Sequence, residues 1–599
     1  MTVDAWLTIA ILAVIFVALL ATRLPPVTIF LGGLTLSATF GLAPLDQSLA
    51  GFSNSGVLTI GALFMVAAGM YSTGAISLLS ERLIGRPKTI LGAQLKILPP
   101  IAFGSAFLNN TPLVAMMIPV IRDLCRSTGL SKAKLYIPLS FASVLGGTCT
   151  LIGTATNLII AGLIIDALAS GAGGAAGLRE IRMFDPSFVA VPAALLGLVL
   201  MIIASKWLLP DTDKISATSM PKRRYGAEFT IPESSPLIGQ TLENTGFAEP
   251  VGFELIELIR RDGSKAKLGR GTRLANGDVL GVSTDLETLA DLWTMNGLAP
   301  YKTLHPMETE RHDHQLVEVV VSPQSPGIGR NVSEFPLPES RYRITLVGIC
   351  RNEKPVAGRF DEVRVEVGDV AVLEVDESFF FVNRDETNFS LVKRVPGYRI
   401  QHFDKAVIAT VITAAMITAA ASGWLTMLNA AMLATGAMLL TGCLTLSVAA
   451  RSIDFATLGV LAAAIGVAAA VSESGLAANL AVLLNRLGQG DPYLALTVIF
   501  IGRVVMANLI TNTASAVFIF PIALSMADQL HVSFMPFAIA LMTGTVGATI
   551  IPASYQTNLM VYGPGEYKVM DFVKMGLPLT LLVGLVTVIL APIFFPFGV

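Results

Sequence analysis

Two short polar interruptions in apolar sequence have residue types that can bind an anion. Asn109–Thr111 and Thr511–Thr513 each precede an apolar run that reaches a proline. Thr156-Asn157 and Thr557-Asn558 follow them downstream, and the separation between the threonines is 45 residues in the first copy and 44 in the second. Because both polar marks recur in the same order at nearly the same spacing, they indicate an internal repeat.

Interrupted helices expose the groups that bind anions. The first N–H groups of a helix lack partners within it and carry partial positive charge, so helices that begin after Thr111 and Thr513 can receive an anion without a cationic side chain. The same turns present carbonyl, amide and hydroxyl oxygens, which are hard ligands suited to Na⁺. A single Asn-Thr before a helix usually serves as an N-cap. The paired copies favour an anion site between two cation sites.

The composition places these interruptions in a membrane protein. The chain has 599 residues, of which 53% are hydrophobic and 14% charged, against about 25% charged in a soluble domain. Its net charge of −2 offers no basic surface for nucleic acid. A bilayer core requires roughly 20 apolar residues per helix. The sequence predicts spans near residues 4–22, 27–43, 55–77, 133–165, 187–209, 406–424, 427–447, 455–472, 493–508 and 573–597.

Three more apolar stretches are broken by polar residues, proline or glycine, at 89–124, 509–530 and 534–565. Irregular backbone at membrane depth is tolerated only where protein or a cavity encloses it. Corresponding breaks in two halves are typical of the binding site of a secondary transporter. Arg503 lies in a further apolar run, so its charge is costly unless it is buried against protein or lies near an interface. It can pair with the anion, but snorkelling to the interface or a structural ion pair is favoured.

A polar insert separates the two membrane halves. Residues 211–400 hold 52 of the 84 charged side chains. Basic residues gather where the insert begins, so the positive-inside tendency predicts that it is cytoplasmic. Ser235–Gly239 recurs as Ser325–Gly329, and Gly277-Asp278 recurs as Gly368-Asp369. The insert is therefore predicted to contain two like subdomains, each built of strands and a short helix.

The paired motifs resemble the twin Ser-Asn-Thr signatures of the divalent anion:sodium symporter family. Leu151–Asn157 and Ile551–Gly565 resemble the loops that close its sites. Tyr555–Gly565 is similar to the sulfate-transporter branch, which also carries paired domains like the C-terminal half of potassium-channel regulator (RCK-C) domains. The resemblance implies one sodium site at Ser105, Asn109, Asn110 and Gly153, a second at Ala507, Thr511, Asn512 and Ala553, and substrate contacts at Asn110, Thr111, Thr154, Asn512, Thr513 and Ser554.

The expected fold is an all-α polytopic membrane protein with two inverted repeats, broken helices and re-entrant hairpins, plus an inserted cytoplasmic α/β regulatory region. The predicted boundaries are 1–210 for the first repeat, 211–303 and 304–403 for the RCK-C-like domains, and 404–599 for the second repeat. The resemblance further implies a homodimer in the cell membrane. The insert can bind a small regulatory ligand or serve only as a buttress.

The sequence predicts a symporter of Na⁺ with a small divalent anion, with sulfate favoured. A dicarboxylate:Na⁺ symporter is the close alternative, and a cation exchanger or channel gated by the insert is the more distant one. No nucleophile–base pair or metal-ligand spacing stands out, so we expect neither enzymatic activity, nor a cofactor, nor a metal other than sodium.

Overall fold

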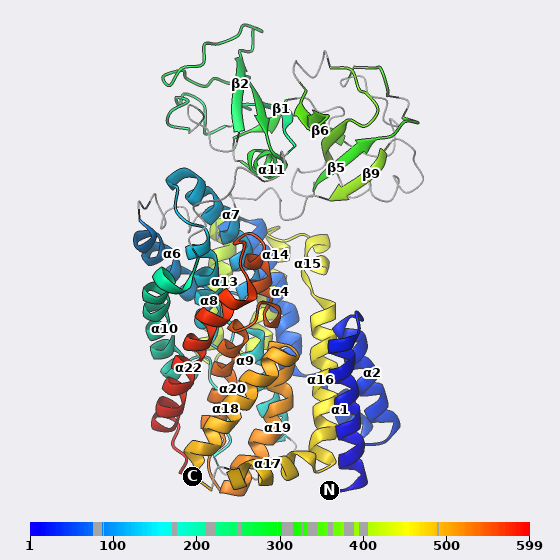
Figure 1. The fold of residues 1–599 in the computed structure, drawn as a ribbon, viewed down its shortest axis with the longest axis vertical. Helices are drawn as coiled ribbons and strands as arrows, with labels where there is room; N and C mark the ends of the chain where they lie inside the picture. Colours follow the sequence, from blue (N-terminus) through cyan, green and yellow to red (C-terminus); the bar gives the residue numbers. More distant parts are fainter. Residues whose placement is uncertain are drawn as a thin grey trace. The chain divides into compact units, whose positions relative to one another are not determined.

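The computed structural model of the chain consists of two compact units (Figure 1). Met1–Lys214 and Phe403–Val599 together form a helical unit, called here the membrane unit, and Ile215–His402 forms the insert, which is built on a β-sheet. The predicted boundary at 303/304 and residues 211–222, which include basic residues at the start of the insert, lie outside the described part. The structure describes all residues except 76–86, 88, 170–176, 211–222, 234, 246, 248–252, 296, 302–314, 326, 332–343, 357–362, 376–388, 395–404, 488–489 and 599.

The described residues of the first membrane half form helices joined by turns. They are α1 (Val3–Ala21), α2 (Pro26–Thr39), α3 (Leu45–Leu49), η1 (Ala50–Phe52), α4 (Ser55–Ser72), α6 (Ile90–Ser105), α7 (Asn110–Thr128), α8 (Ala133–Gly147), α9 (Ala155–Ala169) and α10 (Ser187–Leu208).

The second membrane half has a similar series of helices. They are α13 (Ala406–Ala421), α14 (Met427–Leu440), α15 (Leu446–Ser452), α16 (Phe455–Glu473), α17 (Leu476–Leu487), α18 (Pro492–Leu509), α19 (Asn512–Leu530), α20 (Met535–Thr543), η5 (Gly544–Thr549), η6 (Pro552–Ser554), α21 (Gln556–Tyr562) and α22 (Val569–Phe594).

The two halves pack into a common apolar core. Within the membrane unit, α10 packs along α22, α2 along α16 and α4 along α14 (Figure 1). Both large clusters of buried apolar side chains draw on residues from each half. Six helices in the described part of the chain are long and apolar enough to cross a membrane. The prediction of a membrane-embedded helical protein therefore agrees with the structure.

The helices break at both predicted interruptions. α6 ends at Ser105 and α7 begins at Asn110, while α18 ends at Leu509 and α19 begins at Asn512. Pro112 falls in the first turn of α7, where its missing N–H removes no intrahelical hydrogen bond. Each break therefore exposes a helix N-terminus inside an otherwise apolar stretch.

The expected single span over 133–165 is wrong, because the chain forms two helices there. α8 ends at Gly147 and α9 begins at Ala155. The buried Asn157 donates hydrogen bonds from Nδ2 to the carbonyls of Thr148 (3.3 Å) and Thr150 (2.7 Å), which stabilises the irregular backbone between the helices. Hydropathy alone conceals such a break, since most of its residues are small or apolar.

In the described residues the insert holds a nine-stranded antiparallel sheet with the order β2-β3-β1-β6-β8-β5-β9, in which β4 pairs with β1 and β7 with β6. In each half the strand after the Gly-Asp turn lies between the other two, as in β2-β3-β1 and β6-β8-β5. β1 joins the halves by pairing with β6. The strands are β1 (Tyr225–Thr230), β2 (Phe253–Ile259), β3 (Val279–Thr284), β4 (Ala299–Pro300), β5 (Gln315–Val321), β6 (Ile344–Arg351), β7 (Lys354–Pro355), β8 (Val370–Val375) and β9 (Phe389–Arg394), with the helix α11 (Leu286–Thr294) after β3.

The repeated Gly-Asp turns of the insert have the same contacts in both copies. Asp278 lies 2.5 Å from Arg260 Nη1, and Asp369 lies 2.8 Å from Arg351 Nε. Each aspartate also accepts a backbone hydrogen bond of 2.8 Å from the residue three positions before it. Both carboxylates are buried while both arginines are about three-quarters buried. These pairs hold the turn between the second and third strands in each copy.

Candidate functional site

A cavity of about 530 Å³ lies where the starts of α7 and α19 meet the turns before α9 and α21. Residues of α2, α4 and α16 complete its wall, and Asp454 places an acidic side chain in the lining, where its Oδ1 caps α16 by accepting from the Thr457 N–H at 3.0 Å. The two interruptions therefore meet at one cavity. Its lining includes Asn109, Thr111, Thr154, Thr511, Asn512, Thr513, Ala553, Ser554, Tyr555 and Gln556.

Helices α7 and α19 begin two residues earlier than the sequence predicts. Asn109 caps α7 by accepting from the Thr111 N–H at 3.4 Å, and Thr511 caps α19 by accepting from the Ala514 N–H at 3.3 Å. Capping is thus one role of these residues. Each helix keeps further first-turn N–H groups without an intrahelical partner, so both N-termini retain partial positive charge beside the cavity.

Asn110 lies in a cluster of oxygen atoms behind the lining. Its carboxamide is fully buried. The inner atom of this carboxamide faces Ser105 Oγ at 2.5 Å, the Ser143 carbonyl at 3.1 Å and the Gly153 carbonyl at 3.2 Å. When the amide nitrogen points inward, it donates to all three and the outward amide oxygen accepts from Tyr555 OH; when the oxygen points inward, it lies beside three further oxygens, of which only Ser105 Oγ can donate to it. The second arrangement suits a small hard cation.

The backbone of this oxygen cluster requires glycine at two positions. A Cβ on Gly153 would lie 2.5 Å from the Gly147 carbonyl oxygen, and a Cβ on Gly147 would lie 2.6 Å from Asn110 Oδ1. Of the predicted first sodium site, the structure brings together Ser105, Asn110 and Gly153.

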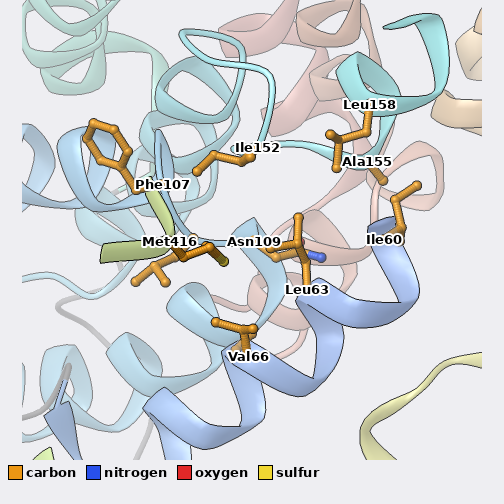
Figure 2. Close-up of a pocket in the computed structure, with 11 residues that line it drawn as sticks. Ile60, Leu63, Val66, Phe107, Asn109, Ile152, Ala155, Leu158 and Met416 are labelled. Carbon is orange, nitrogen blue, oxygen red and sulfur yellow. The ribbon is translucent and has the colours of Figure 1, made fainter. Parts of the chain in front are cut away.

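The side chain of Asn109 has a different environment from these three. Besides the large cavity, it lines a pocket of about 20 Å³ whose other lining residues are apolar. Figure 2 shows Asn109 among Ile60, Leu63 and Val66 of α4, with Ile152 of the turn before α9 also in the pocket. Such a lining provides too few oxygens for a sodium ion.

Asn512 has a positively charged partner. Its Oδ1 accepts a hydrogen bond of 2.6 Å from Arg503 Nη2, and Arg503 also donates to Ser515 Oγ. Arg503 is fully buried, so it does not snorkel to an interface. Its side-chain partners among the described residues are Asn512 and Ser515, and neither of them is acidic. Of the predicted second sodium site, Thr511, Asn512 and Ala553 line the cavity, while Ala507 is buried outside the lining.

The two halves exchange contacts at the site. Tyr555 OH, from the second half, forms a hydrogen bond of 2.7 Å with the outer atom of the Asn110 amide and lies 3.5 Å from Thr154 Oγ1. Asn512 Nδ2 in turn lies 3.4 Å from Thr156 Oγ1 of the first half. Each downstream turn thus contacts the helix start of the opposite half.

Sequence reasoning missed Tyr555 and Gln556 as site residues. Gln556 Oε1 accepts from Thr111 Oγ1 at 3.2 Å. Their position directly before the Thr557-Asn558 mark is a signal that could have found them. Ser554 lines the cavity and donates to Asn508 Oδ1 at 2.9 Å, and Thr513 also lines the cavity.

The arrangement can hold an anion and a small cation close together. Two helix N-termini, hydroxyls and amides supply donors on the cavity side, and the Asn110 cluster supplies oxygens directly behind them. Arg503 adds a full positive charge behind Asn512. Binding and release, rather than bond cleavage, is the chemistry that these groups support.

Comparisons with known proteins agree with this chemistry. Residues 14–544 and 423–598 match the family model described as citrate transporter. A putative sulfur deprivation response regulator of Chlamydomonas reinhardtii is 30% identical over 579 residues, which cover 94% of this chain and 97% of that protein. An uncharacterized transporter of Synechocystis is 29% identical, covering 98% and 96%, and sodium/sulfate cotransporter 1 of Chlamydomonas reinhardtii is 26% identical, covering 90% and 83%.

The matches span nearly the whole chain, and the family model and the relatives named as a transporter or a cotransporter are transporters rather than enzymes. The expected absence of catalysis is therefore confirmed, and the apolar helices make the chain a multi-pass membrane protein. The resemblance to divalent anion:sodium symporters is confirmed as well, and the chain belongs to the citrate transporter family.

Proposed function

We propose that this protein is a symporter that couples Na⁺ to the movement of a small divalent anion, with sulfate as the favoured substrate. The observation that carries the proposal is the meeting of two helix N-termini, each with an Asn-Thr pair, at one cavity beside the Asn110 oxygen cluster. Helix N-termini bind oxyanions through unpaired N–H groups and the helix dipole. The relatives named as sodium/sulfate cotransporters support the pairing of ion and anion.

Thr111, Thr154, Asn512, Thr513 and Ser554 are the proposed anion contacts. They lie on both helix starts and on both downstream turns, and all of them line the cavity. Asn110 would act from behind through its link to Tyr555. Because no cationic side chain appears among the described lining residues, helix dipoles and neutral donors would contact the anion directly.

Sodium is proposed to bind at the Asn110 cluster, with Ser105 Oγ, Asn110 Oδ1 and the carbonyls of Ser143 and Gly153 as ligands. These are neutral oxygens, so the ion's own charge remains available to attract the anion. Binding of one ligand would then favour the other, which is the basis of obligatory coupling.

A dicarboxylate is the second candidate substrate. The cavity volume of about 530 Å³ exceeds the needs of a small inorganic anion, since pockets of about 300–1,000 Å³ accommodate drug-sized ligands. The family model carries the description citrate transporter.

The proposed architecture completes the picture of a carrier. The matching order of helices, breaks and capped starts supports two repeats, which we propose are inverted in the membrane. The duplicated Arg–Asp turns support two like domains in the insert, near 211–303 and 304–403, of RCK-C type and on the cytoplasmic side. A homodimer, and a small ligand of the insert, are further proposals that rest on the family resemblance.

Uptake in proteoliposomes tests the function. Full-length protein should accumulate radiolabelled sulfate when Na⁺ is higher outside than inside, and should not do so when K⁺ replaces Na⁺. Succinate in excess should leave sulfate uptake unchanged if sulfate is the substrate and should abolish it if the site prefers dicarboxylates. Uptake that ignores the Na⁺ gradient would contradict the proposal.

A further inference from the structure

Asn110 and Asn512 occupy equivalent places in the two membrane halves. Each is the first residue of a helix that follows a break, each comes directly after the capping residue, and each is followed by threonine. Both carboxamides are buried. Two equivalent buried amides at one site would be expected to make equivalent contacts, and they do not.

The first half surrounds its asparagine with neutral oxygens. Ser105 precedes Asn110 by five residues and brings its hydroxyl to the amide. Ser143 and Gly153 bring carbonyls. Nothing positively charged faces the inner atom of the Asn110 amide among the described residues.

The second half surrounds its asparagine with a guanidinium and with small residues. Ala507 precedes Asn512 by the same five positions and has no hydroxyl to offer. Arg503 Nη2 donates to Asn512 Oδ1 at 2.6 Å. Gly544 leaves room for this arginine, because a Cβ there would lie 2.7 Å from Arg503 Cγ.

The arginine carries its charge without an acidic partner. Arg503 is fully buried and forms no ion pair with any described residue, and its Nε has no hydrogen-bond partner there. An isolated buried charge in a membrane protein is costly and is retained where it serves binding or transport. The Arg503 charge would therefore be neutralised by a group that binds and is released during transport. A divalent anion in the adjacent cavity is such a group.

We propose that the Arg503 guanidinium permanently takes the place of a mobile cation in the second half, so that the carrier binds one Na⁺ per chain, at the Asn110 cluster. This inference rests on the proposed sodium-coupled anion transport and specifies its stoichiometry. One Na⁺ and one guanidinium carry the two positive charges that offset a divalent anion, while the Asp454 carboxylate in the lining accepts hydrogen bonds from Thr457 at the start of α16. Since only the Na⁺ and the anion cross the membrane, each cycle moves one net negative charge.

Equilibrium binding of ²²Na⁺ to the purified full-length protein tests the stoichiometry without reference to any anion. The wild type should bind one Na⁺ per chain, and Asn110→Ala should bind none. Two sodium ions per chain would overturn the proposal while leaving sodium-coupled transport standing. The absence of sodium binding in the wild type would overturn both. Failure of sulfate uptake alone would contradict only the choice of substrate.

Two variants of the arginine test the role of its charge. Arg503→Lys should still bind one Na⁺ and keep sulfate uptake within about tenfold of the wild type, whereas Arg503→Gln should lose more than tenfold in uptake while eluting as a folded protein and retaining ²²Na⁺ binding. Wild-type uptake by Arg503→Gln with one bound Na⁺ would overturn the proposal. An inside-negative K⁺ diffusion potential should slow uptake by the wild type, and acceleration or indifference would count against it.

Discussion

The membrane unit and the insert are both built from two similar halves, yet they treat their repeated contacts differently. In the insert, Arg260–Asp278 and Arg351–Asp369 are the same pair in the same turn. In the membrane unit, the breaks recur but Asn110 faces oxygens while Asn512 faces Arg503. Copies that each stabilise their own turn keep the same contact. Copies that meet at a single site can have different contacts, because each half can bind a different part of the transported set of ions.

The largest expected effect comes from removing the amide of the first half. Asn110→Ala deletes one oxygen ligand and the link to Tyr555, so Na⁺-dependent sulfate uptake should fall about 100-fold or more, equivalent to about 2.7 kcal/mol of transition-state stabilisation. Asn479→Ala is the matched control, because Asn479 is exposed and its amide donates to the carbonyl of Gly475, just before its own helix α17. Comparable uptake by the two variants would refute the assignment.

Gly147→Ala tests whether sodium binding requires the open space beside the Asn110 amide. A Cβ there would lie 2.6 Å from Asn110 Oδ1, so Gly147→Ala should raise the Na⁺ concentration needed for half-maximal uptake at least about tenfold, equivalent to about 1.4 kcal/mol. Ala548 follows Gly147 by 401 residues, the spacing of Thr156 and Thr557, so the second half already carries this methyl group.

Gly436→Ala is the control for this substitution, since no atom lies within 4 Å of the added Cβ. An unchanged sodium requirement in Gly147→Ala would mean that the Asn110 cluster does not bind the ion.

The two copies in the insert should be destabilised equally when each loses its aspartate. Asp278→Asn and Asp369→Asn each weaken a partly buried pair, so each should destabilise its own turn by about 1–3 kcal/mol, with the arginine's partial exposure reducing the loss. Hydrogen exchange in peptides covering β3 and β8 of the full-length protein measures this. Glu257→Gln disrupts a pair whose lysine is largely exposed and should change exchange little. A much larger increase in hydrogen exchange in one variant than in the other would contradict the claim that both copies rely on the same Arg–Asp pair.

The smallest effect is expected from the tyrosine that links the halves. Tyr555→Phe removes the hydrogen bond between the tyrosine hydroxyl and the Asn110 amide. A hydrogen bond contributes about 0.5–1.5 kcal/mol, so the apparent affinity for sulfate should fall roughly 2- to 12-fold. Tyr562→Phe, whose ring packs against Phe572, is the control. Equal affinities of the two variants would show that this link does not shape the site.

The sequence revealed the helix breaks because Asn-Thr pairs are conspicuous in apolar surroundings. Hydropathy predicted one span across the break between α8 and α9, since glycine, threonine and isoleucine there do not interrupt the apolar run, and only the family resemblance indicated a loop at Leu151–Asn157. The local sequence places Tyr555 beside the Thr557-Asn558 mark, but it does not reveal that its partner is Asn110, 445 residues away. Arg503 was visible as an unusual charge, but only the fold places its guanidinium on Asn512. Contacts between distant halves, rather than local patterns, define these parts of the site.

A density map of the full-length protein with Na⁺ and sulfate tests the central claim most directly. We predict a tetrahedral feature in the cavity, contacted by Thr111 and Thr513 at the starts of α7 and α19, and a separate ion among Ser105, Asn110, Ser143 and Gly153. Sulfate density remote from both helix starts, with no feature between them, would contradict the account.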